Sequence, residues 1–189
     1  MRNLNITDID GNTYKSVIMG TQEWMAENLN VSSYRNGDSI TNVTDKTKWQ
    51  QQATGAYSDY NNTPSYSTTY GKLYNFFSVV DSRNLCPTGW HIPKIEEWNL
   101  LITYIGEPIG NTKLRETGTA HWNSPNRLAT NITGFTALPG GSRNFAGIYG
   151  QLGSQGNWWT STKTTSSTVL SIIKIISIPD YNISFWFFV

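Results

Sequence analysis

The stretch CPTGWHIPKIEEWNLLITYIG, residues 86–106, contains the one long helix that the sequence predicts. Pro93 suits the first turn of a helix, and Glu96 and Glu97 favour the positive end of the helix dipole. Apolar side chains then recur at three- and four-residue spacing, namely Ile95, Trp98, Leu101, Ile102 and Ile105. Gly106 ends this pattern. The segment therefore predicts an amphipathic helix that packs one face on a core.

Strand signals lie towards the two ends of the chain. The segment Asp8–Gly20 predicts a hairpin, because an Asp-Gly pair lies between β-forming residues. Residues 169–178 are nearly all Val, Leu, Ile and Ser, and residues 185–189 are entirely apolar. They predict two strands joined by a turn at Pro179-Asp180. The continuous apolar ending favours a last strand that is covered on both faces.

The segments between these elements predict mostly irregular structure. Ser32 to Tyr70 is rich in Ser, Thr, Asn, Gln and Tyr without a regular apolar period, which predicts a long surface loop. A shorter helix is expected over Leu73 to Val80, and loops with short strands from Gly110 onward. The tyrosines of the long loop suit either stacking on sugars or packing of the loop on the core; they are Tyr57, Tyr60, Tyr66 and Tyr70.

The composition narrows the classes of partner. The 189 residues include 14 Lys and Arg and 13 Asp and Glu, which gives a net charge of +1. This charge creates no electrostatic field that would attract nucleic acid or an acidic membrane. No window reaches the ~18 apolar residues of a membrane span, so no membrane insertion is expected. The single Cys86 excludes an internal disulfide. The length predicts one domain over residues 1–189.

Four phrases are more specific than composition. They are GTQEWMAENL at 20–29; YGKLYNF at 70–76; CPTGWHIP at 86–93 with Glu97-Trp98; and a stretch over 129–162 that includes ALPGG, Arg143 and WWTST. In this order they resemble the major paralogous domain of Fibrobacter succinogenes, over roughly residues 6–162. That family is similar to the formylglycine-generating-enzyme branch of the C-type lectin fold. The resemblance implies an α+β domain with a small twisted antiparallel sheet, one or two helices and extensive loops.

The chemistry of the chain favours binding over catalysis. The oxidase branch uses paired cysteines and a metal, whereas Cys86 stands alone here, so that activity is not carried over. His91 is expected to be a buried histidine with its hydrogen bonds satisfied. Glu116 and His121 form the best candidate acid–base pair, but a structural loop is the favoured interpretation. The tryptophans are expected mainly to fill the core. We therefore expect no catalytic residues.

A calcium site of the lectin kind is not supported. Sugar-binding lectins use Glu-Pro-Asn or Gln-Pro-Asp together with Trp-Asn-Asp, and here only Glu107-Pro108-Ile109 and Trp122-Asn123-Ser124 come near. Neither supplies the oxygen ligands that calcium needs. No cofactor and no functional metal site are expected, while a structural calcium in an Asp/Asn-rich loop stays open as an alternative.

The C-terminus departs from the family pattern. Relatives usually end in a phrase like GFSVRCV, whereas this chain ends ISFWFFV. Of the 27 residues from Lys163 to Val189, six are Ile, five Ser and three Thr. Codons for Ile, Ser and Thr each differ from an Asn codon of the form AAY by the substitution of one adenine. Diversity-generating retroelements randomise template adenines near the 3′ end of their target gene, and C-type lectin domains are their usual targets. The alternatives are that Ile, Ser and Thr simply suit strands, or that a change of reading frame altered the tail.

These observations predict a ligand- or receptor-binding domain with a diversified face from about Asn144 onward. The receptor is expected to be a protein or glycan on a cell surface. The domain is expected at a bacterial surface or on a phage virion. Residues 1–5 lack the apolar core of a secretory signal, which favours the phage virion of the two. A structural or adhesin subunit of a surface fibre, in which the last strands form a homo-oligomer contact, is the alternative. The candidate binding residues are Asn144, Tyr149, Gln151, Gln155, Asn157, Thr164, Thr165, Ser167, Ile173, Ile175, Tyr181 and Asn182.

Overall fold

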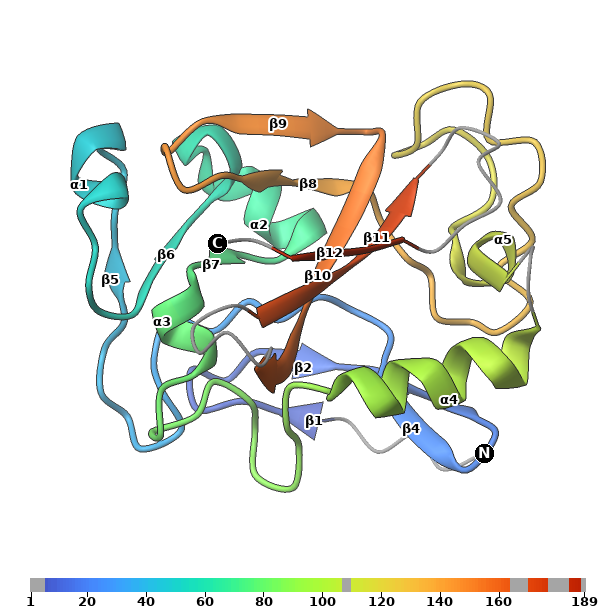
Figure 1. Ribbon diagram of the computed structural model, residues 1–189, viewed down its shortest axis with the longest axis horizontal. Helices are drawn as coiled ribbons and strands as arrows, with labels where there is room; N and C mark the ends of the chain where they lie inside the picture. The colour runs from blue at the N-terminus through green and yellow to red at the C-terminus, as the bar shows by residue number, and fades with distance from the viewer. Residues whose placement is uncertain (1–5, 107–109, 164–169, 177–183, 188–189) are drawn as a thin grey trace.

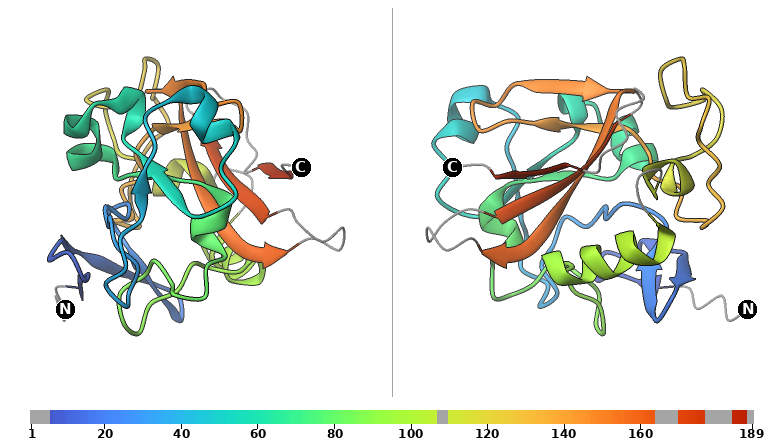
Figure 2. Two further views of the ribbon diagram at one scale, coloured as in Figure 1. Left: turned by 90° about the vertical axis from the view of Figure 1, so that its left-hand side faces the viewer. Right: turned by 45° about the vertical axis from the view of Figure 1, so that its right-hand side comes forward.

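The computed structural model describes residues 6–106, 110–163, 170–176 and 184–187. These residues form an α+β architecture of small sheets, short helices and long connections. Helix α4 (Ile95–Ile105) lies at one end together with the hairpin of β3 (Ser16–Met19) and β4 (Gln22–Met25). The hairpin of β8 (Gly140–Arg143) and β9 (Tyr149–Leu152) lies at the other end (Figure 1). The views in Figure 2 keep this order. Strand β10 (Gln155–Lys163) crosses the space between the two ends.

The N-terminal segment forms two hairpins. Strands β1 (Ile6–Thr7) and β2 (Thr13–Tyr14) pair antiparallel around the Asp-Gly turn, which confirms that part of the prediction. The Asp8 carboxylate stabilises this turn by accepting the backbone N–H groups of Asp10 at 3.0 Å and Asn12 at 2.9 Å. Strand β3 (Ser16–Met19) instead pairs with β4 (Gln22–Met25). The connecting turn needs the positive φ of 62° that Gly20 adopts.

The expectation of one long loop from Ser32 to Tyr70 was wrong. This segment contains β5 (Thr41–Asn42), α1 (Lys46–Gln50), β6 (Ala56–Ser58), the 3-10 turn η1 (Tyr60–Asn62) and α2 (Pro64–Tyr70). The Asp45 side chain caps α1, and Pro64 occupies the first turn of α2. Single buried apolar residues, separated along the chain, hold this segment on the rest of the molecule; they include Tyr34, Ile40, Val43, Trp49 and Ala56. For this reason the sequence of the segment shows no regular apolar period.

The helix expected over Leu73 to Val80 is only partly correct. Leu73–Tyr74 is strand β7, which pairs antiparallel with β6 and completes the sheet β5-β6-β7. Helix α3 covers only Phe76–Val79. It begins there because the Asn75 side-chain oxygen accepts the Ser78 N–H at 3.0 Å, which is an N-cap interaction.

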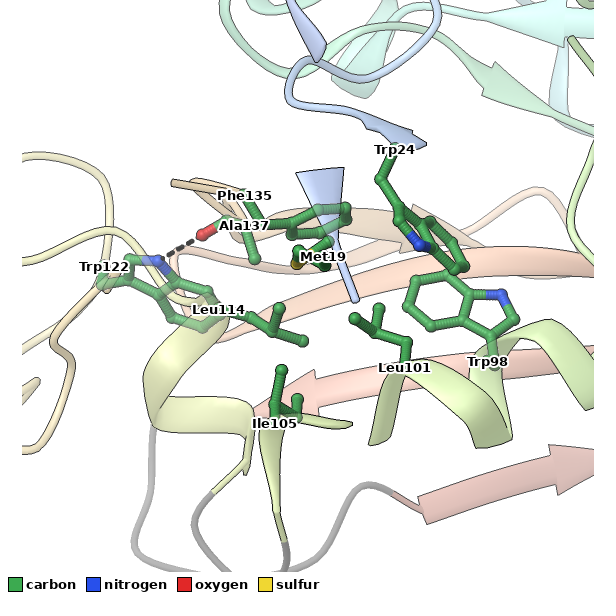
Figure 3. Packing of buried hydrophobic residues seen from close by; sticks show 9 residues of the cluster. All are labelled: Met19, Trp24, Trp98, Leu101, Ile105, Leu114, Trp122, Phe135 and Ala137. Atoms are coloured by element: carbon green, nitrogen blue, oxygen red, sulfur yellow. Dashed lines mark hydrogen bonds between the residues drawn. The ribbon is translucent and has the colours of Figure 1, made fainter. Parts of the chain in front are cut away.

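Helix α4 confirms the main helix prediction. It begins at Ile95, two residues after Pro93, and the Glu97 carboxylate accepts the Lys94 N–H at 2.8 Å. Its inner face contributes Trp98, Leu101 and Ile105 to a core that we call the α4 cluster (Figure 3). The other members are Met19, Trp24, Leu114, Trp122, Phe135 and Ala137. The prediction of only loops and strands after Gly110 missed α5 (Gly110–Leu114), which supplies Leu114.

The second half of the chain supplies the longer strands. Strand β8 (Gly140–Arg143) pairs with β9 (Tyr149–Leu152), and β10 pairs with β11 (Leu170–Ile176), which pairs with β12 (Ser184–Phe187). The two predicted C-terminal strands are thus present. Among the described strands β12 pairs with β11 alone, so it lies at an edge of this sheet. That the last strand is covered on both faces stays a prediction. The predicted turn at Pro179-Asp180 lies outside the described residues.

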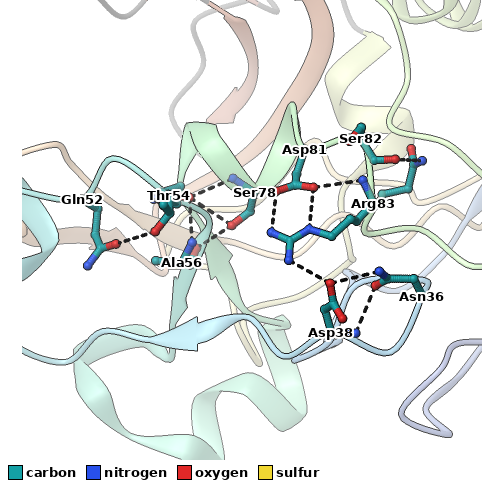
Figure 4. A network of polar contacts seen from close by, with 11 residues as sticks. Asn36, Asp38, Gln52, Thr54, Ala56, Ser78, Asp81, Ser82 and Arg83 are labelled. Atoms are coloured by element: carbon teal, nitrogen blue, oxygen red, sulfur yellow. Dashed lines mark hydrogen bonds and ion pairs between the residues drawn. The ribbon is translucent and has the colours of Figure 1, made fainter.

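A second hydrophobic cluster lies beside the α4 cluster and consists of Val31, Tyr34, Ile40, Val79 and Leu85. A polar network lies beside it (Figure 4). The Arg83 guanidinium lies 4.0 Å from the Tyr34 ring centre and pairs with Asp81 at 2.8 Å and Asp38 at 3.0 Å. These contacts join the segment after α3 to the segment before β5. Within the ranges that the structure describes, no helix has the length and apolar character needed to cross a bilayer.

Candidate functional site

Five aromatic rings form a continuous row at the β8–β9 end of the molecule. The Tyr60 ring centre lies 5.4 Å from Tyr149 and 5.6 Å from Tyr66. Tyr66 lies 6.2 Å from Tyr70, and Tyr70 lies 5.7 Å from His121. All five side chains are half-buried, so each keeps some surface in contact with solvent. We call the row formed by Tyr60, Tyr66, Tyr70, Tyr149 and His121 the tyrosine face.

A buried ion pair holds two of the elements that carry the tyrosine face. The Asp59 carboxylate, just before η1, accepts a hydrogen bond from the Ser67 hydroxyl of α2. Lys72 Nζ lies 3.3 Å from Asp59 Oδ1, and both side chains are largely shielded from solvent. A buried charge is stable only when it is paired and hydrogen-bonded. The Asp59–Ser67–Lys72 contacts therefore fix η1 and α2 relative to each other, and with them Tyr60 and Tyr66.

The backbone around this row contains unusual conformations. Asn61 and Asn62 have φ of 51° and 56°, and Gln151 on β9 has φ of 68°. They are three of the six described residues other than glycine with positive φ. The Tyr149 hydroxyl donates to Asn62 Oδ1 at 2.7 Å, which joins β9 to η1. Asparagine adopts left-handed backbone more readily than most residues with a side chain, so Gln151 is the less usual case of the three.

The face continues onto the tip of the β8–β9 hairpin. The Arg143 guanidinium lies 4.3 Å from the Trp49 ring centre and 4.7 Å from that of Tyr149. Beyond it, Phe145 and Ile148 are 72% and 51% exposed. The arrangement therefore places two unburied apolar side chains beside an aromatic row and a stacked arginine.

The residues predicted to bind are only partly brought together. Tyr149 belongs to the tyrosine face, and Gln151 is exposed on the same strand. Asn144 is exposed but its side-chain oxygen accepts the Ile148 N–H within the hairpin turn. Asn157 is half-buried on β10 and donates to the Gly141 carbonyl.

Three further predicted residues that the structure describes lie outside the tyrosine face. Gln155 is half-buried at the start of β10. Ile173 and Ile175 lie on β11, where they pair with Trp158 and Gly156. The structure does not describe Thr164, Thr165, Ser167, Tyr181 and Asn182. Sequence reasoning left Tyr60, Tyr66 and Tyr70 undecided between stacking and packing, and it missed the Asn-Asn pair beside Tyr60.

Both histidines pair with a glutamate. His121 Nδ1 lies 2.9 Å from both carboxylate oxygens of Glu116, so the predicted pair is in contact. Its ring also meets Tyr70 edge-on, which joins the loop that carries His121 to α2. Burial raises the pKa of the Tyr70 hydroxyl and the charge of Glu116 raises it further, so this hydroxyl stays protonated at neutral pH. His91 was expected to be buried but is exposed, and its Nε2 lies 2.9 Å from Glu97.

A cavity of about 540 Å³ lies where the α4 cluster meets the second cluster. Each of the four phrases quoted from the sequence contributes to its wall. The lining includes several aromatic residues, among them Trp24, Trp90, Trp98, Phe135, Trp158 and Trp159.

Two observations concern metal binding and the reactivity of the cysteine. No three His, Cys, Asp or Glu side chains among them lie close enough together to hold a metal ion. Cys86 is a buried free thiol, and burial raises its pKa to about 11. A thiol of this kind is protonated at neutral pH and therefore a poor nucleophile.

Comparison with known proteins identifies the family of this chain. The chain belongs to the Fibrobacter succinogenes major domain family, because the model of that family matches residues 17–181. No match was found among curated proteins or among solved structures.

Proposed function

We propose that this chain is a ligand-binding domain with a C-type lectin-like scaffold, which recognises a protein receptor at a cell surface. The observation that carries the proposal is the tyrosine face, which continues into the exposed Phe145 and Ile148. Tyrosine, arginine and apolar anchors with a polar surround are the composition of protein interfaces. Tyrosines combined with Asn, Ser and Gly also characterise antibody binding surfaces.

Three properties support a protein partner in particular. The exposed tip supplies apolar anchors that suit a pocket on another protein. The row of rings lies on elements fixed by the buried Asp59–Lys72 pair, so little ordering is needed on binding. The exposed side chains of Asn61 and Gln151 supply neutral hydrogen-bonding groups around the rings.

Binding to intact cells tests this function. We would label the protein with a fluorophore and measure its binding to a panel of bacterial strains by flow cytometry. Binding is expected on at least one strain and should disappear after the cells are treated with protease. The variant Phe145→Ser should lose most of the binding. The matched control Ile18→Ser removes an apolar side chain that is 77% exposed on β3 and should bind like the original protein.

Other outcomes would contradict the proposal. Binding that is lost after periodate oxidation of cell-surface sugars but survives protease would identify a glycan receptor instead. Unchanged binding by Phe145→Ser would place the contact away from the tyrosine face and the hairpin tip beside it. Absence of binding across the panel, together with a stable homo-oligomer in solution, would support the structural subunit of a fibre.

The proposal extends to diversification of residues from about Asn144 onward, with display on a bacterial surface or a phage virion. Its support is the excess of Ile, Ser and Thr between Lys163 and Val189. Sequencing the DNA that follows the gene tests it. The expected result is a near-identical repeat that differs only at adenines, beside a reverse-transcriptase gene. A flanking region without this repeat would overturn diversification and leave an invariant receptor-binding domain.

A further inference from the structure

A second cavity, beside the first strand, combines one cationic side chain with apolar walls. It lies between residues 6–9, which include β1, and residues 85–90, which precede α4, and its volume is about 400 Å³. Ligand pockets usually occupy roughly 300–1,000 Å³ and combine apolar walls with a few polar groups. We call it the Arg35 cavity, after the one basic residue among the described residues of its lining. The apolar residues of the lining are Ile6, Ile9, Leu85, Cys86, Pro87 and Trp90.

Hydrogen bonds to the backbone hold the Arg35 guanidinium against one wall of this cavity. Its Nε donates to the Cys86 carbonyl at 2.7 Å. Its Nη2 donates to the carbonyls of Pro87 at 3.1 Å and Trp90 at 2.7 Å. All three acceptors belong to residues that line the cavity. Because the guanidinium is planar, these bonds fix its position and its orientation before any ligand binds.

The third nitrogen of this guanidinium is available to a ligand. Nη1 donates to no described residue, yet it keeps contact with solvent, unlike Tyr34 Oη and Trp98 Nε1, which have neither a partner nor accessible surface. No carboxylate among the described residues forms an ion pair with Arg35. Arg35 lines the cavity, so Nη1 is the donor that it can offer there. Guanidinium N–H groups bind carboxylates through strong, charge-assisted hydrogen bonds.

The acidic residue of the described lining, Asp8, already has its hydrogen bonds satisfied. Its Oδ1 accepts the N–H groups of Asp10 and Asn12, and its Oδ2 accepts the Asn12 amide at 2.8 Å and the Tyr14 hydroxyl at 2.5 Å. A carboxylate has about four acceptor positions, so Asp8 has none left for a ligand. Its charge still repels a second anion nearby, which favours a monovalent carboxylate over a divalent phosphate.

The Arg35 cavity is open to solvent along one side. Thr7 and Thr88 are exposed residues of its lining, and Ile9 is 54% exposed. The hydroxyls of Thr7 and Thr88 make no hydrogen bond within the described part of the chain, so they are available as further donors. A small molecule can therefore enter between β1 and the segment that carries Thr88.

We propose that the Arg35 cavity binds a small aromatic carboxylic acid. Its carboxylate accepts a hydrogen bond from Arg35 Nη1, and its ring packs against Trp90 and the apolar residues beside it. The site is separate from the receptor contact proposed above, because none of its described lining residues belongs to the tyrosine face.

Two probes that share a ring and differ in charge test this site. Benzoate carries a carboxylate, and benzamide replaces it with a neutral group of nearly the same shape. Dissociation constants are measured by NMR titration of the isotope-labelled protein at low ionic strength. Benzoate is expected to bind in the millimolar range, and benzamide at least about tenfold more weakly. The benzoate affinity should fall severalfold in about 0.5 M sodium chloride, because salt screens a pair that is open to solvent.

The same titration locates the site. The backbone amide signals that shift with benzoate should belong to residues 6–9 and 85–90, which form the walls of the Arg35 cavity.

A substitution tests the cation itself. Arg35→Met removes the donor and should weaken benzoate about tenfold while it leaves benzamide nearly unchanged. The matched control Arg127→Met removes the same charge from an exposed residue outside this lining and should have no effect. Arg35→Met also loses three hydrogen bonds, so its folding is checked by near-ultraviolet circular dichroism. If it does not fold, the two probes, the salt dependence and the shifted signals still decide the proposal, because they use the original protein.

Several results would overturn the proposal. Absence of benzoate binding, or equal affinity for benzoate and benzamide, would show that the cavity does not select a carboxylate. Shifted signals confined to other residues would place the benzoate site elsewhere. Equal weakening by Arg35→Met and Arg127→Met would attribute the effect to the net charge of the protein and not to Arg35.

Discussion

The α4 cluster and the tyrosine face are both built from aromatic residues, but they use them in opposite ways. In the α4 cluster the rings are almost wholly buried, and Trp122 donates its indole N–H to the Ala137 carbonyl at 3.0 Å. In the tyrosine face every ring keeps part of its surface exposed, and the shielded Asp59–Lys72 pair holds η1 and α2, which carry three of the rings. The first arrangement stabilises the fold, whereas the second exposes rings that a partner can contact.

The difference follows from the chemistry of the two side chains. Tryptophan removes the largest apolar area from water, so its burial contributes most to stability. Tyrosine has a hydroxyl that favours contact with water or a polar neighbour, as Tyr149 shows by donating to Asn62. Mutations in the two regions should therefore affect stability and binding in different proportions.

The largest effect is expected inside the α4 cluster. Leu101 is 0% exposed, and its neighbour Leu100 on the same helix is 60% exposed. Leu101→Ala should lower the free energy of unfolding by about 3 kcal/mol, because it removes transfer energy and leaves a cavity. Leu100→Ala should change it by less than about 0.5 kcal/mol. Urea unfolding measures both, and similar losses would contradict the assigned inner face of α4.

The second largest effect is expected beneath the tyrosine face. Lys72→Met leaves the buried Asp59 carboxylate without its cation and should cost about 2 kcal/mol. Arg83→Met breaks an exposed pair and should cost less than about 1 kcal/mol.

A double variant checks that the ion pair itself is responsible. Lys72→Met combined with Asp59→Leu should recover part of the loss, since no unpaired charge then remains. Urea unfolding of the singles and the double gives the coupling free energy. Strictly additive losses would show that packing, and not charge, holds η1 to α2.

A smaller, pH-dependent effect is expected at the start of α4. Burial alone would raise the pKa of the Glu97 carboxyl, but the hydrogen bond from Lys94 and the contact with His91 hold this pKa below its ordinary value. The pKa of Glu97 is lower in the folded protein than in the unfolded chain. Ionised Glu97 therefore stabilises the folded state fully above the ordinary carboxyl pKa, and this stabilisation is lost as the pH falls through the pKa of the folded state. It should amount to about 1 kcal/mol, typical of a helix cap.

Unfolding measured from neutral to acidic pH checks this contribution. Glu97→Gln should remove that part of the pH dependence, whereas Glu96→Gln, at an exposed neighbour, should preserve it. An unchanged slope in Glu97→Gln would show that this carboxylate does not stabilise the helix.

The sequence predicted the elements whose signals are local. The apolar period of α4 and the Asp-Gly turn between β1 and β2 need no distant partner to be recognised. The region 32–70 was misjudged because α1 and α2 have only five and seven residues, too short to show an apolar period. Their stability depends on a cap, a proline and single buried anchors such as Trp49.

The candidate site was predictable only in part, for a related reason. Tyr149 and Gln151 were expected because they lie late in the chain, but the partner rings come from residues 60–70. Whether a tyrosine packs or remains available depends on what the fold brings next to it, and β9 meets η1 only through tertiary structure. The cavity was likewise invisible, since its wall combines four segments that are far apart along the chain.

The smallest effect on stability is expected on the tyrosine face itself. Tyr149→Phe keeps the ring and removes only the partly solvated hydrogen bond to Asn62, so unfolding should change by about 0.5 kcal/mol or less. Tyr104→Phe, at an exposed tyrosine on α4, is the matched control. If the face contacts a receptor, Tyr149→Phe should weaken cell binding severalfold while Tyr104→Phe does not. A loss of stability above about 2 kcal/mol without a change in binding would instead mean that these tyrosines, like the tryptophans of the α4 cluster, serve only to hold the fold.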